Sequence, residues 1–289
     1  MKRIYVTLAS RIDGDQTDIE DAGQVVILDW DTKSVVKIVQ VTSEETVSSG
    51  RTRGACGIAW HEGFIYVACR QQILALDPDT YTLDHSISMG EPTGYHHIGS
   101  HEDKLWIICT GGDIKQSIVN REVKDTIHVG GSSISTGFKD RKHFNTIAWD
   151  SEGDCYHLYM QGNCVVNFTK NKTVVSGLGS MPHDICFIND DEFLVSESAC
   201  GNLIKCNKNT GSKQTVFSRP VTTVGEGYRK MGFMRGIAFD KNTNTVFLTT
   251  APGVIYELDA STFKERDKLT FLNSGPSCTY DILLDPRDW

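Results

Sequence analysis

The sequence predicts an all-β protein: a six-bladed β-propeller built as one domain over residues 1–289. The first observation is a short phrase of an isoleucine followed by small or apolar residues, which recurs at Ile58, Ile98, Ile147, Ile185, Ile237 and Ile282. By subtraction, successive isoleucines are 40, 49, 38, 52 and 45 residues apart. A four-stranded propeller blade repeats every 40–50 residues or so. The second observation is that no segment shows long helical periodicity.

Each repeat divides into four predicted strands. In the first complete repeat these are Gly57–Trp60, Phe64–Cys69, Ile73–Leu76 and Leu83–Ser88. A turn signature, Asp or Asn followed three residues later by Thr, separates the last two strands. It begins at Asp29, Asp77, Asn207 and Asp259. The side-chain oxygen of the first residue accepts a backbone hydrogen bond two residues on, so this pattern is typical of a turn.

The two ends of the chain are predicted to complete each other. The N-terminal region supplies three strands, Arg3–Leu8, Val25–Leu28 and Val35–Val41, with no innermost strand before them. The C-terminal region supplies the single strand Tyr280–Leu284. One strand plus three makes a sixth blade, and this pairing closes the ring and removes its open edges.

Composition excludes several classes of protein. With 39% hydrophobic residues the chain can build a core, so disorder is excluded. Its longest apolar runs are of strand length, which argues against a membrane protein. The net charge of −8 argues against a generic nucleic-acid binder. The opening MKRIYVTLAS lacks the apolar region of a secretory signal, and nine cysteines occur without a CxxC pair. A cytoplasmic protein with reduced thiols is expected.

Four long segments are predicted to leave the same face of the ring: Ser10–Gly23, Thr42–Gly54, Gly130–His143 and Arg219–Met234. Long insertions in a compact fold are usually functional or disordered, so this face is a predicted binding surface. The last two segments are rich in Lys and Arg, which favours a small anionic molecule as ligand. Arg53, Arg229 and Lys230, together with His97, are the predicted substrate-binding residues.

The strongest functional observation is a polar column. The position two residues before each repeated isoleucine is expected to line the central axis, and it holds Cys56, His96, Asn145, His183, Arg235 and Tyr280. The next position holds Gly57, His97, Thr146, Asp184, Gly236 and Asp281. A purely structural core would prefer Val, Leu or Ala at these places, so we expect an active or ligand-binding site.

Two histidines, an amide oxygen and a thiol at the end of a narrow channel are suitable metal ligands. His96, Asn145, His183 and Cys56 are therefore predicted to bind a divalent metal, with zinc, iron, manganese or copper favoured over calcium because of the histidines. Arg235 would hold an anionic substrate group, and Asp184, Tyr280 and Asp281 would move protons. Polar residues that only bind water in the channel are the structural alternative.

Three phrases resemble known propellers. Asn145-Thr-Ile-Ala-Trp-Asp and Pro182-His183-Asp184-Ile-Cys-Phe resemble phrases of the SMP-30/gluconolactonase family, and Met234-Arg235-Gly236-Ile-Ala-Phe-Asp240 is similar to the NHL-type strand phrase. The resemblance implies a metal that serves lactone hydrolysis, with Asn145 and His183 as ligands and His96 at a ligand or substrate position. Cys56 stands where that family has glutamate, and His183 where it has aspartate.

Two functions remain open from the sequence. The first is a metal-dependent enzyme, a lactone or ester hydrolase or else a lyase or isomerase, that acts on a small anionic metabolite in the axial channel. The second is a propeller without catalytic activity that binds a protein or glycan through its long-loop face. Exposed aromatic and arginine side chains typically anchor such interfaces, and Phe138, Tyr228 and Phe233 are candidates.

Overall fold

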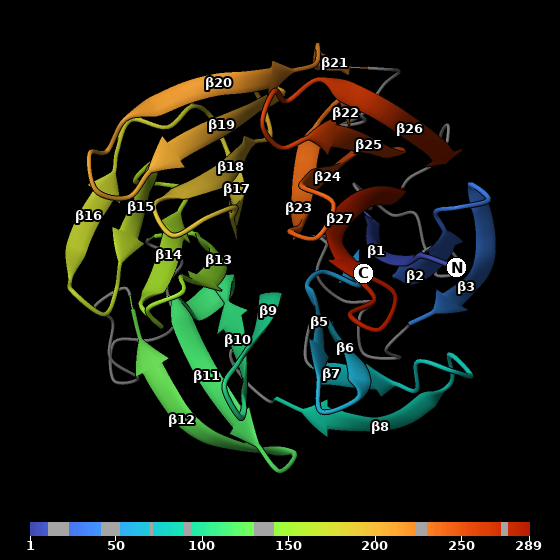
Figure 1. Ribbon diagram of the computed structural model, residues 1–289. Helices are drawn as coiled ribbons and strands as arrows, with labels where there is room; N and C mark the ends of the chain where they lie inside the picture. The colour runs from blue at the N-terminus through green and yellow to red at the C-terminus, as the bar shows by residue number, and fades with distance from the viewer. Residues whose placement is uncertain are drawn as a thin grey trace.

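The computed structural model describes residues 1–10, 23–41, 53–69, 72–89, 94–129, 142–223, 230–272 and 277–289. Six four-stranded antiparallel sheets stand around a central axis as the blades of a propeller (Figure 1). The predicted six-bladed all-β fold is confirmed. No helix in the described part of the chain has the length and apolar character needed to cross a membrane.

Within each of blades 1 to 5 the strands run outward from the axis in chain order. Blade 1 contains β5 (Ile58–His61), β6 (Phe64–Ala68), β7 (Gln72–Leu76) and β8 (Leu83–Ser88). Blade 2 contains β9 (Tyr95–His101), β10 (Lys104–Cys109), β11 (Ile114–Val119) and β12 (Glu122–His128), with a short 3-10 turn at Thr110–Gly112. Blade 3 contains β13 (Phe144–Trp149), β14 (Cys155–Tyr159), β15 (Cys164–Asn167) and β16 (Lys172–Val175).

The second half of the ring repeats this order. Blade 4 contains β17 (Pro182–Phe187), β18 (Glu192–Glu197), β19 (Asn202–Asn207) and β20 (Lys213–Ser218). Blade 5 contains β23 (Met234–Asp240), β24 (Thr245–Thr250), β25 (Gly253–Asp259) and β26 (Glu265–Leu272). A two-stranded ribbon of β21 (Thr222–Thr223) and β22 (Lys230–Met231) precedes blade 5.

Blade 6 joins the two ends of the chain as predicted. Its innermost strand is β27 (Ser277–Leu284), followed outward by β1 (Arg3–Ser10), β2 (Gln24–Asp29) and β3 (Ser34–Gln40). The short strand β4 (Arg53–Gly54) also pairs with β1. In Figure 1 the blue N-terminal and red C-terminal strands therefore lie side by side in one sheet.

Apolar side chains fill the space between neighbouring blades. The six largest buried clusters of the described residues each combine residues of two adjacent blades. All six repeated isoleucines are buried in them or beside them. Full burial of an isoleucine or leucine side chain stabilises the fold by about 1.5–3 kcal/mol, so these interfaces supply most of the driving force for closing the ring.

The predicted turn signature is confirmed at all four of its positions. The side-chain oxygen of Asp77 accepts hydrogen bonds from the backbone N–H groups of Asp79 and Thr80 and from the Thr80 hydroxyl. The same backbone bonds form at the other three signatures, at Asp29, Asn207 and Asp259. Each of these turns therefore satisfies its own backbone groups where the last two strands of a blade connect.

A buried polar network fastens the closing blade. Asp285, directly after β27, accepts the Tyr5 hydroxyl at 2.6 Å and two hydrogen bonds from the Arg287 guanidinium. Arg3 lies 3.4 Å from the same carboxylate and also pairs with Asp288. Burial opposes ionisation of Asp285, but the hydrogen bonds from Arg287 and Tyr5 keep its pKa below the usual value.

Replacing Asp285 by alanine is expected to lower the free energy of unfolding by about 3 kcal/mol, because it leaves buried partners without their carboxylate. Asp79→Ala is the matched control, since Asp79 pairs with Arg287 from a side chain that is 75% exposed; it is expected to cost under about 1 kcal/mol. Urea unfolding followed by circular dichroism measures both. Equal losses for the two variants would show that closure does not depend on the buried network.

Candidate functional site at the propeller axis

Every inner strand is irregular at the level of the predicted column. Along β9, Tyr95 faces Cys109 and His97 faces Ile108, which leaves His96 as an extra residue. Comparable register shifts occur at this level in β13, β17, β23 and β27. Just before β5, both Cys56 and Gly57 bond to the single residue Ala68. These are β-bulges, which re-aim side chains and allow two successive residues of one strand to turn toward the axis.

The first set of side chains at the axis, here called the upper layer, consists of His96, His183 and Tyr280. They come from β9, β17 and β27, which are the inner strands of alternate blades. Their ring centroids are 5.1 Å apart for the two histidines, 4.9 Å for His96 and Tyr280, and 4.8 Å for His183 and Tyr280. The three side chains therefore meet across the axis, and the two histidines predicted as ligands do converge.

Hydrogen bonding determines the tautomer of His96. Its Nδ1 lies 3.2 Å from the backbone carbonyl oxygen of Asn145, and a carbonyl can only accept, so Nδ1 carries the hydrogen. Its Nε2 contacts the Tyr280 hydroxyl, which must donate to it. Both nitrogens of His96 are therefore engaged, and Tyr280 is joined to a potential proton acceptor.

The next set of axial side chains, the lower layer, consists of His97, Asp184 and Asp281, again from β9, β17 and β27. His97 Nε2 lies 3.8 Å from a carboxylate oxygen of Asp184 and 3.7 Å from one of Asp281. His97 Nδ1 is buried without a hydrogen-bond partner. An imidazole between two buried carboxylates forms a compact group that can hold and share protons.

Both lower-layer carboxylates also join blades together. Asp184 accepts hydrogen bonds from the N–H of the next residue and from the N–H of Ile237 in blade 5, each at 2.8 Å. Asp281 likewise accepts from the N–H of the next residue at 2.8 Å and from Ile58 in blade 1 at 3.1 Å. The structure thus gives these two predicted catalytic residues a structural task, which sequence reasoning had missed.

The remaining three blades contribute small residues at the level of the lower layer: Gly57, Thr146 and Gly236. A Cβ atom on Gly57 would lie 2.7 Å from the Cα of His97, and one on Gly236 would lie 2.7 Å from the Cα of Asp281. Thr146 instead donates its hydroxyl to the carbonyl of His183. Large and small residues therefore alternate around the ring, which lets the inner strands approach closely.

Burial shifts the protonation of both layers toward neutral forms. Burial lowers the pKa of His97 to about 4 and lowers those of His96 and His183 well below the usual value, with nearby positive groups adding to the effect for the latter two. Burial raises the pKa of Asp184 to about 7. It also raises the pKa of Asp281 strongly, and the neighbouring Asp184 raises it further. Perturbed titrations of this kind are typical of functional sites.

Besides His97 Nδ1 in the lower layer, three further buried polar atoms at the axis have no hydrogen-bond partner among the described residues. They are Asn145 Oδ1, His183 Nε2 and Arg235 Nε, from the consecutive inner strands β13, β17 and β23. The Arg235 guanidinium lies 4.4 Å from the ring centroid of Phe233 and 5.1 Å from that of Tyr280. Buried polar groups are normally paired, so these three atoms from adjacent blades leave hydrogen-bonding capacity unused at one place on the axis.

The axial donors do not form a ready metal site. Cys56 is buried and packs with Ala9 and Tyr280, and the Nε2 lone pair of His96 is used by Tyr280. Only Asn145 and His183 of the predicted ligand set offer an unpartnered donor atom. Completing a metal shell with His96 would require Tyr280 to turn away.

Among the described residues, one group of His, Cys, Asp or Glu side chains has three ligand atoms within 4.8 Å of one another. It comprises Asp150, Glu152 and Asp154 at the β13–β14 turn. Lys208 lies 2.7 Å from Asp150, and Lys170 lies 2.5 Å from Asp154. The buried carboxylates of Asp150 and Asp154 are thus already paired with lysines, so this group gives no support for a metal site.

The predicted substrate-binding residues lie mostly outside what the structure describes. Arg229 is outside the described residues, and for Arg53 in β4 and Lys230 in β22 only the backbone is described. His97 is at the axis, but in the lower layer. Phe138 and Tyr228, and most of the four long segments, also fall outside the described residues.

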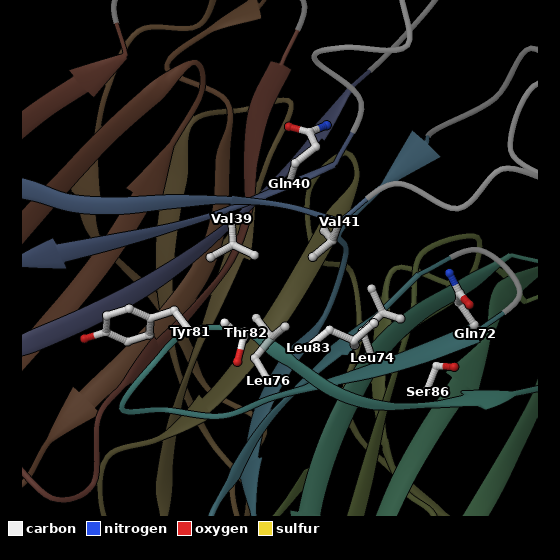
Figure 2. Close-up of a pocket in the computed structure, with 10 residues that line it drawn as sticks. All are labelled: Val39, Gln40, Val41, Gln72, Leu74, Leu76, Tyr81, Thr82, Leu83 and Ser86. Atoms are coloured by element: carbon white, nitrogen blue, oxygen red, sulfur yellow. The ribbon is translucent and has the colours of Figure 1, made fainter.

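Two surface cavities lined by described residues lie away from the axis. One, of about 380 Å³, lies between blades 6 and 1. Figure 2 shows Val39 and Val41 on one side of it and Leu74, Leu76 and Leu83 on the other. Half of its lining residues are aliphatic, and the others carry amide or hydroxyl groups, so it has none of the imidazole, carboxylate or guanidinium groups gathered at the axis.

Comparison with known proteins supports the fold. A protein of unknown function from Bacteroides caccae is similar over 97% of this chain and 99% of its own, with a TM-score of 0.68 and 13% identity. The β-propeller domain of Myceliophteria thermophila Cps50 (Swd1) matches 87% of this chain and 82% of its own, with a TM-score of 0.54 and 12% identity. A chain of the mitotic checkpoint complex matches 87% of this chain and 73% of its own, with a TM-score of 0.53 and 12% identity.

The sequence matches no family model and none of the curated proteins compared with it. Identities of 12–13% show a common fold and nothing finer. The comparisons therefore agree with a β-propeller and give no evidence for the SMP-30/gluconolactonase or NHL families in particular.

The lower layer is expected to give opposite pH dependences in two variants. Between pH 3.8 and about 7 the folded protein keeps a proton on Asp184 that the unfolded chain has released, so this group makes the free energy of unfolding fall as pH rises. Between pH about 4 and 6.5 the unfolded chain instead binds a proton at His97 that the folded protein does not. This group therefore makes the free energy of unfolding rise as pH rises.

Urea unfolding between pH 4 and pH 7 measures both effects as the stability of the wild type minus that of the variant. This difference is expected to fall with pH for Asp184→Asn and to rise with pH for His97→Gln. Parallel pH profiles for the wild type and both variants would contradict the assigned protonation states.

Proposed function

We propose that the protein is an enzyme that acts on a small anionic molecule at the upper layer of the axis. The observation that supports this most directly is the set of unpartnered buried atoms on Asn145, His183 and Arg235. A folded protein rarely leaves three such atoms unpaired in adjacent strands, and a ligand with both donor and acceptor groups would satisfy them.

Arg235 is the proposed anion-binding residue. Its guanidinium is held against the rings of Phe233 and Tyr280, which orients it while leaving Nε unpaired. Burial keeps the neighbouring histidines neutral, so Arg235 supplies the positive charge beside the upper layer. A carboxylate or phosphate bound there would replace lost hydration with a charge-assisted hydrogen bond.

Tyr280 and His96 are the proposed proton-transfer pair. The Tyr280 hydroxyl donates to His96 Nε2, while His96 Nδ1–H is fixed on the Asn145 carbonyl. When a substrate group gives a proton to the Tyr280 oxygen, the hydroxyl proton can pass to His96, and the reverse movement returns it. Asp184, His97 and Asp281 would hold protons beneath this pair and fix the inner strands. Ester or lactone hydrolysis, elimination and isomerisation all require such transfers.

A divalent metal bound by Asn145 Oδ1 and His183 Nε2 is a further proposal. It rests on those two unpartnered atoms and on the resemblance of their sequence phrases to the SMP-30/gluconolactonase family. When bound, a metal would polarise a carbonyl or acidify a water molecule. His96 and Cys56 would have to reorient to complete its shell.

Binding of a protein partner through the long-loop face is the second candidate function. It is favoured by the neighbouring fold found in the mitotic checkpoint complex, where a similar propeller is part of an assembly. The two functions are distinguishable because the enzyme requires the axial residues, whereas partner binding requires the long segments.

Thermal-shift screening with hydroxycarboxylates, sugar phosphates and inorganic phosphate is expected to find at least one stabilising anion. Arg235→Gln should weaken its binding, measured by calorimetry, about 10–100-fold, because one charge-assisted hydrogen bond contributes about 1.5–3 kcal/mol. Tyr280→Phe should retain binding and slow turnover of that compound by about 100-fold or more.

Arg219→Gln is the matched control for this experiment. Arg219 stacks on Phe217 and Tyr256 and pairs with Glu265 on the outer part of the molecule, so its replacement should leave binding unchanged. If no anion binds the wild type, or if both arginine variants bind alike, the enzyme proposal fails.

Metal analysis by mass spectrometry tests the metal proposal separately. Untagged wild-type protein is expected to carry about one transition metal per chain, and His183→Ala is expected to lose it, because imidazole nitrogen is a strong ligand. His101→Ala removes a histidine that stacks on Trp149 and serves as the control. A metal-free wild type purified without chelators would contradict the proposal.

A further inference from the structure

A buried lysine and a buried cysteine face each other between blades 2 and 3. Lys115 belongs to β11, the third strand of blade 2, and Cys155 begins β14, the second strand of blade 3. Lys115 is 5% exposed and Cys155 is 6% exposed. The Lys115 Nζ donates to the Cys155 Sγ at 3.5 Å. This contact lies outside the axial site and has no part in the proposed catalysis.

Lys115 has no carboxylate partner among the described residues. Its Nζ lies 4.2 Å from the ring centroid of Phe168 and 5.0 Å from that of Trp106, so aromatic rings surround it together with the thiol. Lysine is almost never fully buried without a counter-ion. Burial lowers the pKa of Lys115 and raises that of Cys155, and both shifts favour a neutral amine beside a neutral thiol.

We propose that Lys115 and Cys155 form a reversible covalent N–O–S bridge between blades 2 and 3 when dioxygen is present. The two atoms that would be joined already lie 3.5 Å apart, and an inserted oxygen requires only a small further approach. Cys155 and O₂ would first form an S–O–OH group, and an unprotonated Lys115 amine has the lone pair needed to attack the sulfur-bound oxygen. This attack forms the N–O bond, breaks the O–O bond and releases hydroxide, which takes the proton lost from nitrogen and leaves as water. Nitrogen nucleophiles are known to trap oxidised cysteines, as in the sulfenamide.

The proposed reaction is balanced with dioxygen as the sole oxidant. The Lys115 amine, the Cys155 thiol and one O₂ give the N–O–S bridge and one water. One N–H, one S–H and the O–O bond break, and N–O and O–S bonds form. The second oxygen leaves with the two released hydrogens. Nitrogen and sulfur together lose four electrons, so two equivalents of a dithiol restore the amine, the thiol and one further water.

The bridge would link two blades at their buried interface. Lys115 and Cys155 are 40 positions apart in the sequence, so the bridge closes a long loop of chain. A cross-link of this kind restricts the unfolded chain more than the folded one. Oxidation is therefore expected to stabilise the ring, and a thiol reductant to reverse this.

Intact-mass measurement of the full-length protein tests the proposal. After incubation in air-saturated buffer, a species heavier by about 14 Da, one oxygen less two hydrogens, is expected. Dithiothreitol should remove it. Proteolysis should place the added mass on a cross-linked pair of peptides containing Lys115 and Cys155. Thermal unfolding of the oxidised sample should occur several degrees above that of the reduced sample.

Variants separate the bridge from ordinary thiol oxidation. Cys155→Ser and Lys115→Arg should each abolish the species heavier by 14 Da. Cys69→Ser should retain it, because Cys69 is a buried thiol whose pKa is raised by burial alone. The wild type alone can overturn the proposal: no added mass, or only the gains of about 16 or 32 Da of sulfenic and sulfinic acids at Cys155, would exclude the bridge.

Discussion

The β-bulge in each inner strand is the constraint on which the axial site depends. In a regular strand, successive side chains point to opposite faces, and His96 and His97 would separate onto the two sides of blade 2. The extra residue in β9 instead lets one imidazole meet His183 and Tyr280 while the next meets Asp184 and Asp281. Because the bulge recurs around the ring, two complete layers of side chains face the axis.

Once both layers face inward, the alternation of large and small residues decides how tightly the ring can close. Blades 2, 4 and 6 place imidazole, carboxylate and phenol groups at the axis, while Gly57 and Gly236 let neighbouring strands approach. The cost is a set of polar groups removed from water. Backbone N–H groups offset that cost for the carboxylates, but they leave His183 Nε2 and Arg235 Nε unpaired. The protein thus keeps, at its centre, buried polar atoms that no other described residue pairs.

Much of this architecture could be predicted from residue types and spacing. The repeated isoleucines predicted the number of blades, and the turns that begin at Asp77 and its equivalents located the outer hairpins. Because the N-terminal region supplies three strands without an innermost one, Tyr280–Leu284 was predicted to close the ring. The column containing His96 and His183 was identified from that alignment, and their rings lie 5.1 Å apart.

Other features could not be read from the sequence because they depend on three-dimensional contacts. The engagement of His96 Nε2 by Tyr280 joins residues 184 positions apart, and it occupies a nitrogen of a predicted metal ligand. The backbone bonds of Asp184 exist only because blade 5 lies beside it. No sequence motif connects Lys115 with Cys155, because Lys115 lies in the third strand of blade 2 and Cys155 in the second strand of blade 3.

Closure of blade 6 by β27 has a consequence for biosynthesis. Tyr280 and Asp281 complete the upper and lower layers, and they are translated after the inner strands of the other five blades. A nascent chain therefore presents His96, His97, His183 and Asp184 without Tyr280 and Asp281 until β27 has been made. Both axial layers are assembled only when β27 joins the ring, so a chain that stops before β27 has an incomplete axis as well as an open sheet edge.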